Sequence, residues 1–474
     1  MLRHWVLSLF SLSLFSLSLL AAPPAPNWAS PNWASIEAET LRHFQALVRL
    51  DTSDPPGREA PAVEYLQKVL EAEGIPCKVF THTPGRPNLV ARLKGNGTKK
   101  PLLLMAHTDV VNVDPAKWTF PPFSAARDSG YIYGRGTLDD KDNLTAALMT
   151  MLLLKRLNVP LDRDVIFLAE AGEEGTSTIG IIYMIREHWP EIEAEFCLAE
   201  GGAVLRRDGK LSRMTVATTE KVPARATLRV RGTAGHGSVP LADNAIVHIS
   251  QAVARAAAWR TPMKLNDTTR TYFERLATIS TPEQAANYNN LVNPDKTAAI
   301  QQYLRLREPR HDSMLRTSIS PTVLKGGYRM NVIPSEAEAT LDIRTVPDEN
   351  LNQFFAELAR QINDPAVEIT RGPMTRQPTP PSRLDTDLFR FLEQAQQQVY
   401  PGAITLPTMS TGATDMALLR EKGVQCYGIG SLVDEEDAAK GFGAHSDQER
   451  ILEAELHRFV RFNWAVVTQT AARQ

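Results

Sequence analysis

Four short, almost entirely apolar runs constrain most strongly what this 474-residue chain can fold into. Each run ends at a polar cluster, and stretches with helical spacing of apolar residues lie between them. Apolar runs of this length predict strands buried on both faces, which is typical of parallel sheets covered by helices. The sequence therefore predicts an α/β domain with a mostly parallel sheet. The runs are residues 102–105, 165–169, 196–199 and 424–429.

A different pattern occupies residues 222–372. Here apolar and polar residues alternate in short segments, which predicts strands with one solvated face. The order strand, helix, strand, strand, helix, strand predicts a ferredoxin-like α+β domain inserted into the α/β domain, with a mostly helical insertion at 265–318. The expected strands are 226–232, 337–344 and 367–370, and the expected helices are 244–259 and 349–362. The α/β domain is expected over 36–221 and 373–474.

The N-terminal residues are not expected to belong to either domain. A basic start precedes an apolar run over residues 5–20, which is shorter than the roughly 20 residues of a spanning helix and predicts a secretory signal peptide over 1–22. Two copies of Pro-Asn-Trp-Ala-Ser follow, and residues 23–35 are predicted to be a linker. We therefore expect an exported protein, periplasmic or secreted, that contacts a membrane only if the signal segment stays uncleaved.

Composition excludes several classes of protein. The formal net charge is −2 and 22% of residues are charged, so the chain lacks the basic excess of a nucleic-acid binder. Its three cysteines show no CxxC spacing, which argues against a disulfide framework and a thiolate metal site. Any bound metal ion must use imidazole and carboxylate ligands.

Imidazoles and carboxylates follow each of the four apolar runs, and another acidic pair precedes the apolar helix expected at 144–157. Because the carboxyl ends of parallel strands meet at one edge of a sheet, we expect these side chains to converge. Singly, each has an ordinary structural explanation, but so many buried carboxylates together need a cation. The residues are His107, Asp109, Glu170, Glu173, Glu174, Glu200 and His445, with Asp139 and Asp140 as the acidic pair.

A count of charges fits two divalent ions. Asp139, Glu174 and Glu200 supply three negative charges, and one bridging hydroxide balances the fourth positive charge. Nitrogen and oxygen ligands without thiolate favour zinc, with cobalt or manganese as alternatives. Two such ions activate water and polarise a substrate oxygen, while a spare carboxylate acts as general base. Glu173, which the count does not need, is the expected base.

Several sequence motifs resemble one enzyme family. In order along residues 37 to 465, they are similar to the co-catalytic zinc peptidases and amidases, which include carboxypeptidase G, aminoacylase, carnosinase and succinyl-diaminopimelate desuccinylase. Each motif alone is weak, but the ordered set is specific. The motifs are Met105-Ala-His-Thr-Asp-Val110, Gly134-Arg-Gly-Thr-Leu-Asp-Asp-Lys141, Ala171-Gly-Glu-Glu-Gly175, Ala199-Glu-Gly-Gly202, Gly235-His-Gly-Ser238 and Gly443-Ala-His-Ser446.

The resemblance implies roles for these residues. Glu173 would be the general base, and Asp109 would orient the imidazole of His107. A cis peptide bond would follow the bridging Asp139. The implied metal ligands are His107 and Glu200 for one ion, Glu174 and His445 for the other, and Asp139 for both.

The inserted domain resembles the lid of that family. His236 resembles the histidine that binds the carbonyl oxyanion, although a solvated turn histidine is the plain alternative. Arg344, with Asn331 upstream, resembles the position that binds a substrate carboxylate, although a surface arginine at a strand end explains it equally well. Gly412 belongs to a loop that resembles the family's substrate-side loop.

These observations predict an exported hydrolase that cleaves amide bonds of small peptides with a free carboxylate, of the carboxypeptidase or dipeptidase type, by a metal-bridging hydroxide. An N-acyl-amino-acid amidohydrolase of the aminoacylase type is the main alternative. A non-catalytic binding module on the same fold is a remote alternative, because such a chain would have lost ligands. The expected partners are the small substrate and a second copy of the chain paired through the lid.

Overall fold

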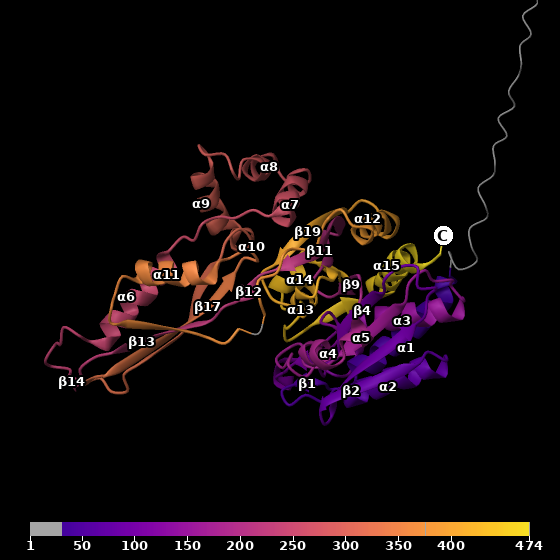
Figure 1. Cartoon of the computed structure of the whole chain (residues 1–474), viewed down its shortest axis with the longest axis horizontal. Coiled ribbons are helices and arrows are strands. Elements are labelled where there is room, and N and C mark those ends of the chain that lie inside the picture. The colour runs from indigo at the N-terminus through magenta and orange to yellow at the C-terminus, as the bar shows by residue number, and fades with distance from the viewer. Residues whose placement is uncertain (1–30, 375, 474) are drawn as a thin grey trace, which may run out of the picture.

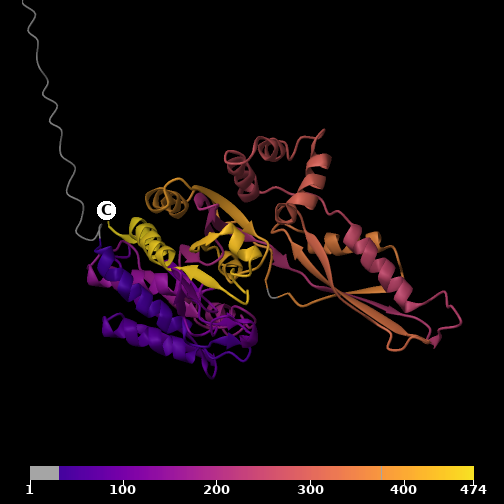
Figure 2. The same cartoon turned by 180° about the vertical axis from the view of Figure 1, so that it is seen from behind.

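The computed structural model of the chain describes residues 31–374 and 376–473, so the predicted signal peptide and most of the linker lie outside the described residues. Figures 1 and 2 show the two predicted domains: the α/β domain, called the catalytic domain below because most of the predicted site residues belong to it, and the lid domain, which extends away from it on two connecting segments. No helix in the described ranges is both long and apolar enough to cross a membrane.

The catalytic domain is built on a ten-stranded sheet. Its four central strands run parallel and carry the four predicted apolar runs. Two of the flanking pairs are also parallel and the other four are antiparallel, so the predicted parallel centre has mixed flanks. The order is β2 (Cys77–Thr83), β3 (Arg86–Leu93), β8 (Val165–Glu170), β4 (Leu102–His107), β9 (Phe196–Ala199), β20 (Gln425–Gly428), β11 (Lys210–Glu220), β10 (Ala203–Arg207) and β21 (Leu432–Asp434), with β19 (Ile404–Ser410) paired to β11.

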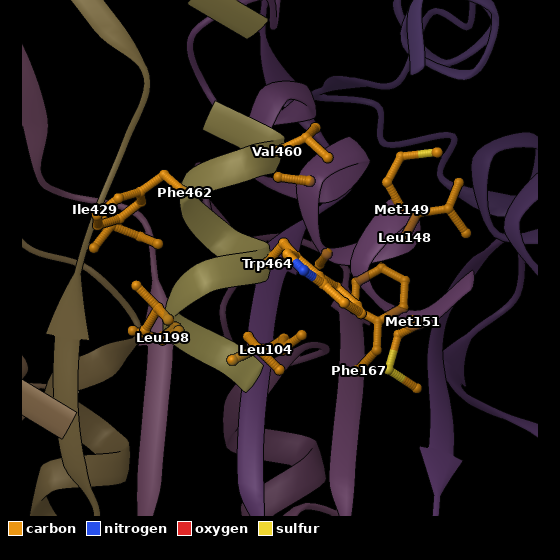
Figure 3. Close-up of a cluster of buried hydrophobic side chains, with 14 of the residues drawn as sticks. Leu104, Leu148, Met149, Met151, Phe167, Leu198, Ile429, Val460, Phe462 and Trp464 are labelled. Carbon is orange, nitrogen blue, oxygen red and sulfur yellow. The ribbon is translucent and has the colours of Figure 1, made fainter. Parts of the chain in front are cut away.

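Helices cover both faces of this sheet, because its central strands are apolar on both sides. Leu102 and Leu104 of β4 belong to one core, and Leu103 and Met105 belong to the other. Figure 3 shows Trp464 of the last helix among side chains of the first core. That core uses α1 (Trp33–Val48), α2 (Ala60–Ala72), α3 (Lys141–Arg156), α12 (Asp387–Val399) and α15 (Glu453–Ala471), and the second uses α4 (Ile181–Glu187), α5 (Trp189–Ile192) and α13 (Met416–Glu421).

The predicted linker ends earlier than expected. Helix α1 begins at Trp33 rather than after residue 35, because Trp33 packs against the first core and the Arg461 guanidinium lies over its ring. The remaining short elements of this domain are β1 (Ser53–Asp54), β5 (Val110–Val111), the 3-10 helix Pro115–Lys117, β6 (Ala126–Asp128), β7 (Tyr131–Tyr133), α14 (Glu435–Ala439) and β22 (Arg450–Leu452).

The lid has the ferredoxin-like plan. Its antiparallel strands lie in the order β15, β17, β13, β18, which places the first and third strands in the centre, and β12 also pairs with β17. Alternate residues of β17 are buried against α6 and α11. The elements are β12 (Val222–Pro223), β13 (Ala226–Arg231), α6 (Ala245–Ala258), β15 (Ser318–Gly326), β17 (Glu336–Thr345), α11 (Leu351–Ile362) and β18 (Val367–Arg371), with β14 (Gly235–His236) and β16 (Val332–Ile333) in a separate ribbon.

The insertion within the lid is helical and bridges the two domains. Its core joins Phe273 and Leu304 to Val346 of the lid and to Leu406 and Met409 of β19 in the catalytic domain. In both views it stands to one side, between the lid and the catalytic domain. Its helices are α7 (Asp267–Ala277), α8 (Pro282–Asn289), α9 (Thr297–Arg307) and α10 (Pro309–Met314).

Candidate active site

The predicted metal ligands come together at one edge of the catalytic sheet. They form two groups of three, within each of which the candidate ligand atoms all lie within 4.8 Å of one another, and both groups contain Asp139. Nε2 of His107 lies 2.9 Å from Oδ1 of Asp139, whereas Nε2 of His445 lies 3.1 Å from its Oδ2 and 2.9 Å from Oε1 of Glu174. Glu200 completes the first group. One oxygen of Asp139 thus faces each group.

The parallel strands explain this convergence. Strand β4 ends at His107, β9 ends just before Glu200, and β8 ends shortly before Glu174. Gly172 allows the chain to turn directly after β8, since its φ is +78° and an added Cβ would lie 2.8 Å from a backbone oxygen. Asp139 comes from the loop before α3, and His445 comes from the loop before β22.

The surroundings of these groups set their charges. Removal from water, together with the neighbouring Asp139, raises the pKa of Glu200 well above its usual range. Burial also opposes ionisation of Asp139, but hydrogen bonds with His107 and His445 outweigh it and lower the pKa of this carboxyl. Hydrogen bonds with Asp139 and Glu174 raise the pKa of His445 to about 10.

The residues present fit two divalent ions. Each group offers one imidazole nitrogen and two carboxylate oxygens, a set without thiolate that suits zinc and related metals. Nδ1 of His107 lies 2.9 Å from the backbone oxygen of Asp109, so the geometry assigns the ring proton to Nδ1 and leaves Nε2 as the ligand atom.

The carboxylate of Asp109 has a different main partner from the one expected. It lies 3.6 Å from Nδ1 of His107 but accepts hydrogen bonds from the backbone N–H groups of Gly172, Glu173 and Glu174 at 2.8, 3.1 and 3.0 Å. The backbone oxygen of Asp109 orients the imidazole, and its carboxylate holds the loop that carries two candidate site residues.

The two residues of the acidic pair have different contacts. Asp139 faces the ligand groups, whereas Asp140 accepts hydrogen bonds from the amide of Asn143 at 2.7 Å and from the backbone N–H of His107 at 3.2 Å. The peptide bond between Asp139 and Asp140 is cis.

Glu173, the expected general base, lies in a buried group of charges. Burial and the nearby Asp415 raise the pKa of its carboxyl well above the usual range. Arg376 balances this charge: its Nη2 lies 2.5 Å from Oδ1 of Asp415, 3.4 Å from Oγ of Ser177 and 4.0 Å from Oε1 of Glu173. Sequence reasoning missed Arg376. The available signal was a lone basic residue in the Pro-rich segment that returns from the lid.

The remaining predicted residues do not join this cluster in the conformation described. His236 is exposed, contacts Oγ of Ser238 at 2.7 Å, and lies in β14 at the far end of the lid from β4 (Figure 1), next to Asn331. Arg344 on β17 pairs with Asp342 at 2.9 Å. Gly412 is exposed in the loop after β19.

A cavity of about 310 Å³ opens beside Asp139 and Glu200. Its wall is largely apolar, and two of its carboxylates have cationic partners: Asp434 contacts Arg206 at 2.5 Å, and Asp437 contacts Arg450 at 2.9 Å. This wall suits an apolar group next to the metal site. The apolar lining includes Leu138, Ala203, Ile429, Leu432, Val433 and Leu452.

Two ligand groups that share one carboxylate, at the carboxyl edge of an α/β sheet with an inserted ferredoxin-like lid, are an arrangement typical of metal-dependent hydrolases. The chain belongs to peptidase family M20/M25/M40, whose pattern it matches over residues 103–469. Proteins similar to the chain carry the names of metallopeptidases and amidohydrolases, among them a carboxypeptidase S-like protein and an aminoacylase.

Individual relatives agree with this membership. The chain is 32% identical over 69% of its length to a probable carboxypeptidase S-like 2 of Dictyostelium discoideum, and 31% identical over 67% to human N-fatty-acyl-amino acid synthase/hydrolase PM20D1. The alignments span only 64% of either relative's length.

Solved structures share the fold. An M20 family metallo-carboxypeptidase of Sulfolobus solfataricus matches with a TM-score of 0.69 at 19% identity, covering 90% of this chain and 98% of that chain. A dinuclear metal-binding peptidase of Bacillus subtilis from the same family matches with a TM-score of 0.58 at 14% identity, covering 92% of this chain and 99% of that one. The predicted fold class and family resemblance are therefore confirmed.

Proposed function

We propose that this protein uses two divalent metal ions, most favourably zinc, to hydrolyse an amide bond next to an amino acid with a free carboxylate. The observation that carries the proposal is the sharing of Asp139 between two ligand groups. His107 and Glu200 would complete one metal site, and Glu174 and His445 would complete the other. When bound, such ions lower the pKa of water and polarise the scissile carbonyl.

The chain supplies the proton transfers. Glu173 would take a proton from the attacking water and deliver it to the nitrogen of the leaving amino acid. Burial and the nearby Asp415 raise the pKa of Glu173, so its carboxyl group would hold this proton between the two steps. Arg376 lies 4.0 Å from Glu173, and its positive charge would keep this carboxyl group ionised in part of the protein molecules before the reaction.

Two substrate classes fit this chemistry. The first is a small peptide cleaved at its C-terminal residue, as a carboxypeptidase or dipeptidase would do. The second is an N-acyl amino acid, and the cavity beside Asp139 and Glu200 favours it when the acyl group is apolar. Because Asp434 and Asp437 already have arginine partners, neither is free to bind a substrate ammonium group. The name of the human relative also supports this second class.

A substrate panel tests the proposal. We expect the protein to hydrolyse dipeptides with a free carboxylate or N-acyl amino acids. A chelator should abolish this activity, and zinc, cobalt or manganese should restore it. If the cavity takes the acyl group, kcat/KM should rise about threefold to fourfold for each methylene added to the chain. Full activity after exhaustive removal of metal would refute the proposal.

Two neighbouring variants separate the roles of base and ligand. Glu173→Ala should retain both metal ions and lose turnover by about 10²-fold to 10⁴-fold, the usual range for a general base. Glu174→Ala should instead lose metal from its site. Metal content by emission spectrometry, measured beside turnover, distinguishes these outcomes. Undiminished activity of Glu173→Ala would contradict the assignment.

His236, Asn331 and Arg344 lie on the lid, so any contact with substrate requires the lid to close or a second copy of the chain to supply them. We propose a homodimer through the lid, supported by the exposure of most of the edge strand β15. Sedimentation of the full chain tests the dimer. Mixing His236→Ala with Glu173→Ala, each inactive alone, should restore activity only if His236 acts on the partner subunit.

We also propose export to the periplasm or medium, supported by the apolar run at residues 5–20. Cell fractionation with N-terminal sequencing of the mature chain tests this, and recovery of the uncleaved chain in membranes would favour an anchor.

A further inference from the structure

A second cavity lies away from the active site, between the lid and its insertion. It measures about 320 Å³, near the lower end of the range for small-ligand sites. The end of α6 and the start of β15 form its lid side, and α9 and α10 form its insertion side. Three arginines from these segments line it, namely Arg260, Arg305 and Arg316.

Positive charge exceeds negative charge in the wall. Among the described residues, Asp312 is the only carboxylate that lines the cavity, and both of its oxygens already accept hydrogen bonds. Arg260 contacts them at 2.8 and 3.0 Å, and Nε of Arg316 contacts one of them at 3.2 Å. Arg305 is exposed on α9 and forms no ion pair with any of the described residues. Three guanidinium groups and one carboxylate leave two positive charges uncompensated.

A buried lysine stands directly behind this wall. Nζ of Lys221 donates to Oγ of Ser318 at 2.7 Å and to the Oγ and backbone oxygen of Ser313 at 3.2 and 3.1 Å. It has no carboxylate partner among the described residues, and burial together with the nearby Arg344 lowers its pKa to about 7. The other charges near it are paired with each other: Arg344 with Asp342, and Arg316 with Asp312.

The two serine hydroxyls therefore accept hydrogen bonds from Lys221, which leaves their own O–H groups free to donate. No hydrogen bond donated by either hydroxyl is found within the ranges that the structure describes. Ser313 and Ser318 both line the cavity. The wall thus presents guanidinium and hydroxyl donors and no free acceptor carboxylate, which is the pattern expected around an anion.

We propose that this cavity binds a tetrahedral oxyanion of the phosphate class, either free or as a monoester. Guanidinium groups match the geometry of phosphate oxygens, and hydroxyl donors fill the remaining positions. The ligand contacts elements of both the lid and the insertion, so its binding ties these two segments together and stabilises the folded chain. This site is independent of the proposed amide hydrolysis.

Calorimetric titration of inorganic phosphate into the full chain, at constant ionic strength in chloride, tests the proposal. We expect saturable binding, and at least a tenfold higher Kd in Arg305→Gln because one charge-assisted contact is lost. Arg305 is exposed and unpaired among the described residues, so its substitution should not disturb folding. A parallel titration with glycerol 3-phosphate shows whether the site takes a free or an esterified phosphate.

Arg307→Gln is the matched control, because Arg307 is also exposed on α9 but does not line the cavity. It should bind phosphate like the unaltered protein. Phosphate held at the metal site instead would give the same Kd in all three proteins, and this result would overturn the proposal. Absence of saturable heat with either ligand at millimolar concentration would also overturn it.

Discussion

Replacement of Asp109 by asparagine tests how the loop that carries Glu173 and Glu174 is held. The carboxylate is buried and accepts three backbone N–H groups: Oδ1 takes those of Gly172 and Glu173, and Oδ2 takes that of Glu174. Asparagine keeps the shape but offers one oxygen and one NH₂ group. At least one backbone N–H must therefore face another donor.

The magnitude follows from these three bonds. A buried N–H without a partner costs about 1–3 kcal/mol, and the loss of the negative charge weakens the remaining bonds by roughly 1 kcal/mol. We expect Asp109→Asn to lower the free energy of unfolding by about 2–4 kcal/mol. Because the loop also carries Glu174, metal affinity should fall by about tenfold to a hundredfold.

Urea denaturation gives the first quantity, and competition for zinc with a chelating dye gives the second. Asp128→Asn is the matched control, since Asp128 is exposed and, among the described residues, its carboxylate bonds only to the hydroxyl of its neighbour Ser129. It should change neither quantity measurably. Unaltered stability and unaltered zinc affinity in Asp109→Asn would refute the reasoning about the loop.

Three further perturbations are predicted. Arg86→Met should lower the free energy of unfolding by about 3–5 kcal/mol, because it leaves the carboxylates of Glu59 and Asp54 buried without their cation. An unchanged midpoint in thermal or urea denaturation would contradict this. Burial opposes ionisation of Glu308, but hydrogen bonds from His311 and two other side chains lower its pKa to about 2. Because this pKa is below that of the unfolded chain, the ionised carboxylate stabilises the fold by at most about 3 kcal/mol. This stabilisation is present above about pH 4.5 and is lost as pH falls toward 2. The stability difference between the unaltered protein and Glu308→Gln should shrink over that interval, and a constant difference would refute the assignment. Arg376→Gln should lower kcat by roughly tenfold with little change in KM, whereas Arg376→Lys should restore part of the rate, because the positive charge near Glu173 matters; equal losses in both variants would indicate a purely structural role.

The insertion shows a limit of reading periodicity along the chain. Its helices were expected from spacing, since helical repeats are local. The sequence does not predict how these helices pack, because Phe273 contacts a core that includes Met409, a residue that follows the rest of the lid in the sequence. The mixed flanks of the sheet have the same origin: an apolar run indicates that a strand is buried but not the direction of its neighbour.

The sequence by itself determined the class of fold and the chemistry of the candidate ligands, because both are written in short stretches: apolar runs that must be buried, and imidazoles or carboxylates at their ends. Only the tertiary structure decided which atoms of Asp109 act on which partners, that Arg376 stands beside Glu173, and that three arginines surround one cavity. The contacts of the Asp109 carboxylate with the loop join residues 63 to 65 positions apart, Arg376 lies 39 positions from Asp415 and 199 from Ser177, and the arginines come from different segments. The free energy of such contacts depends on how whole elements pack, which local residue patterns do not encode.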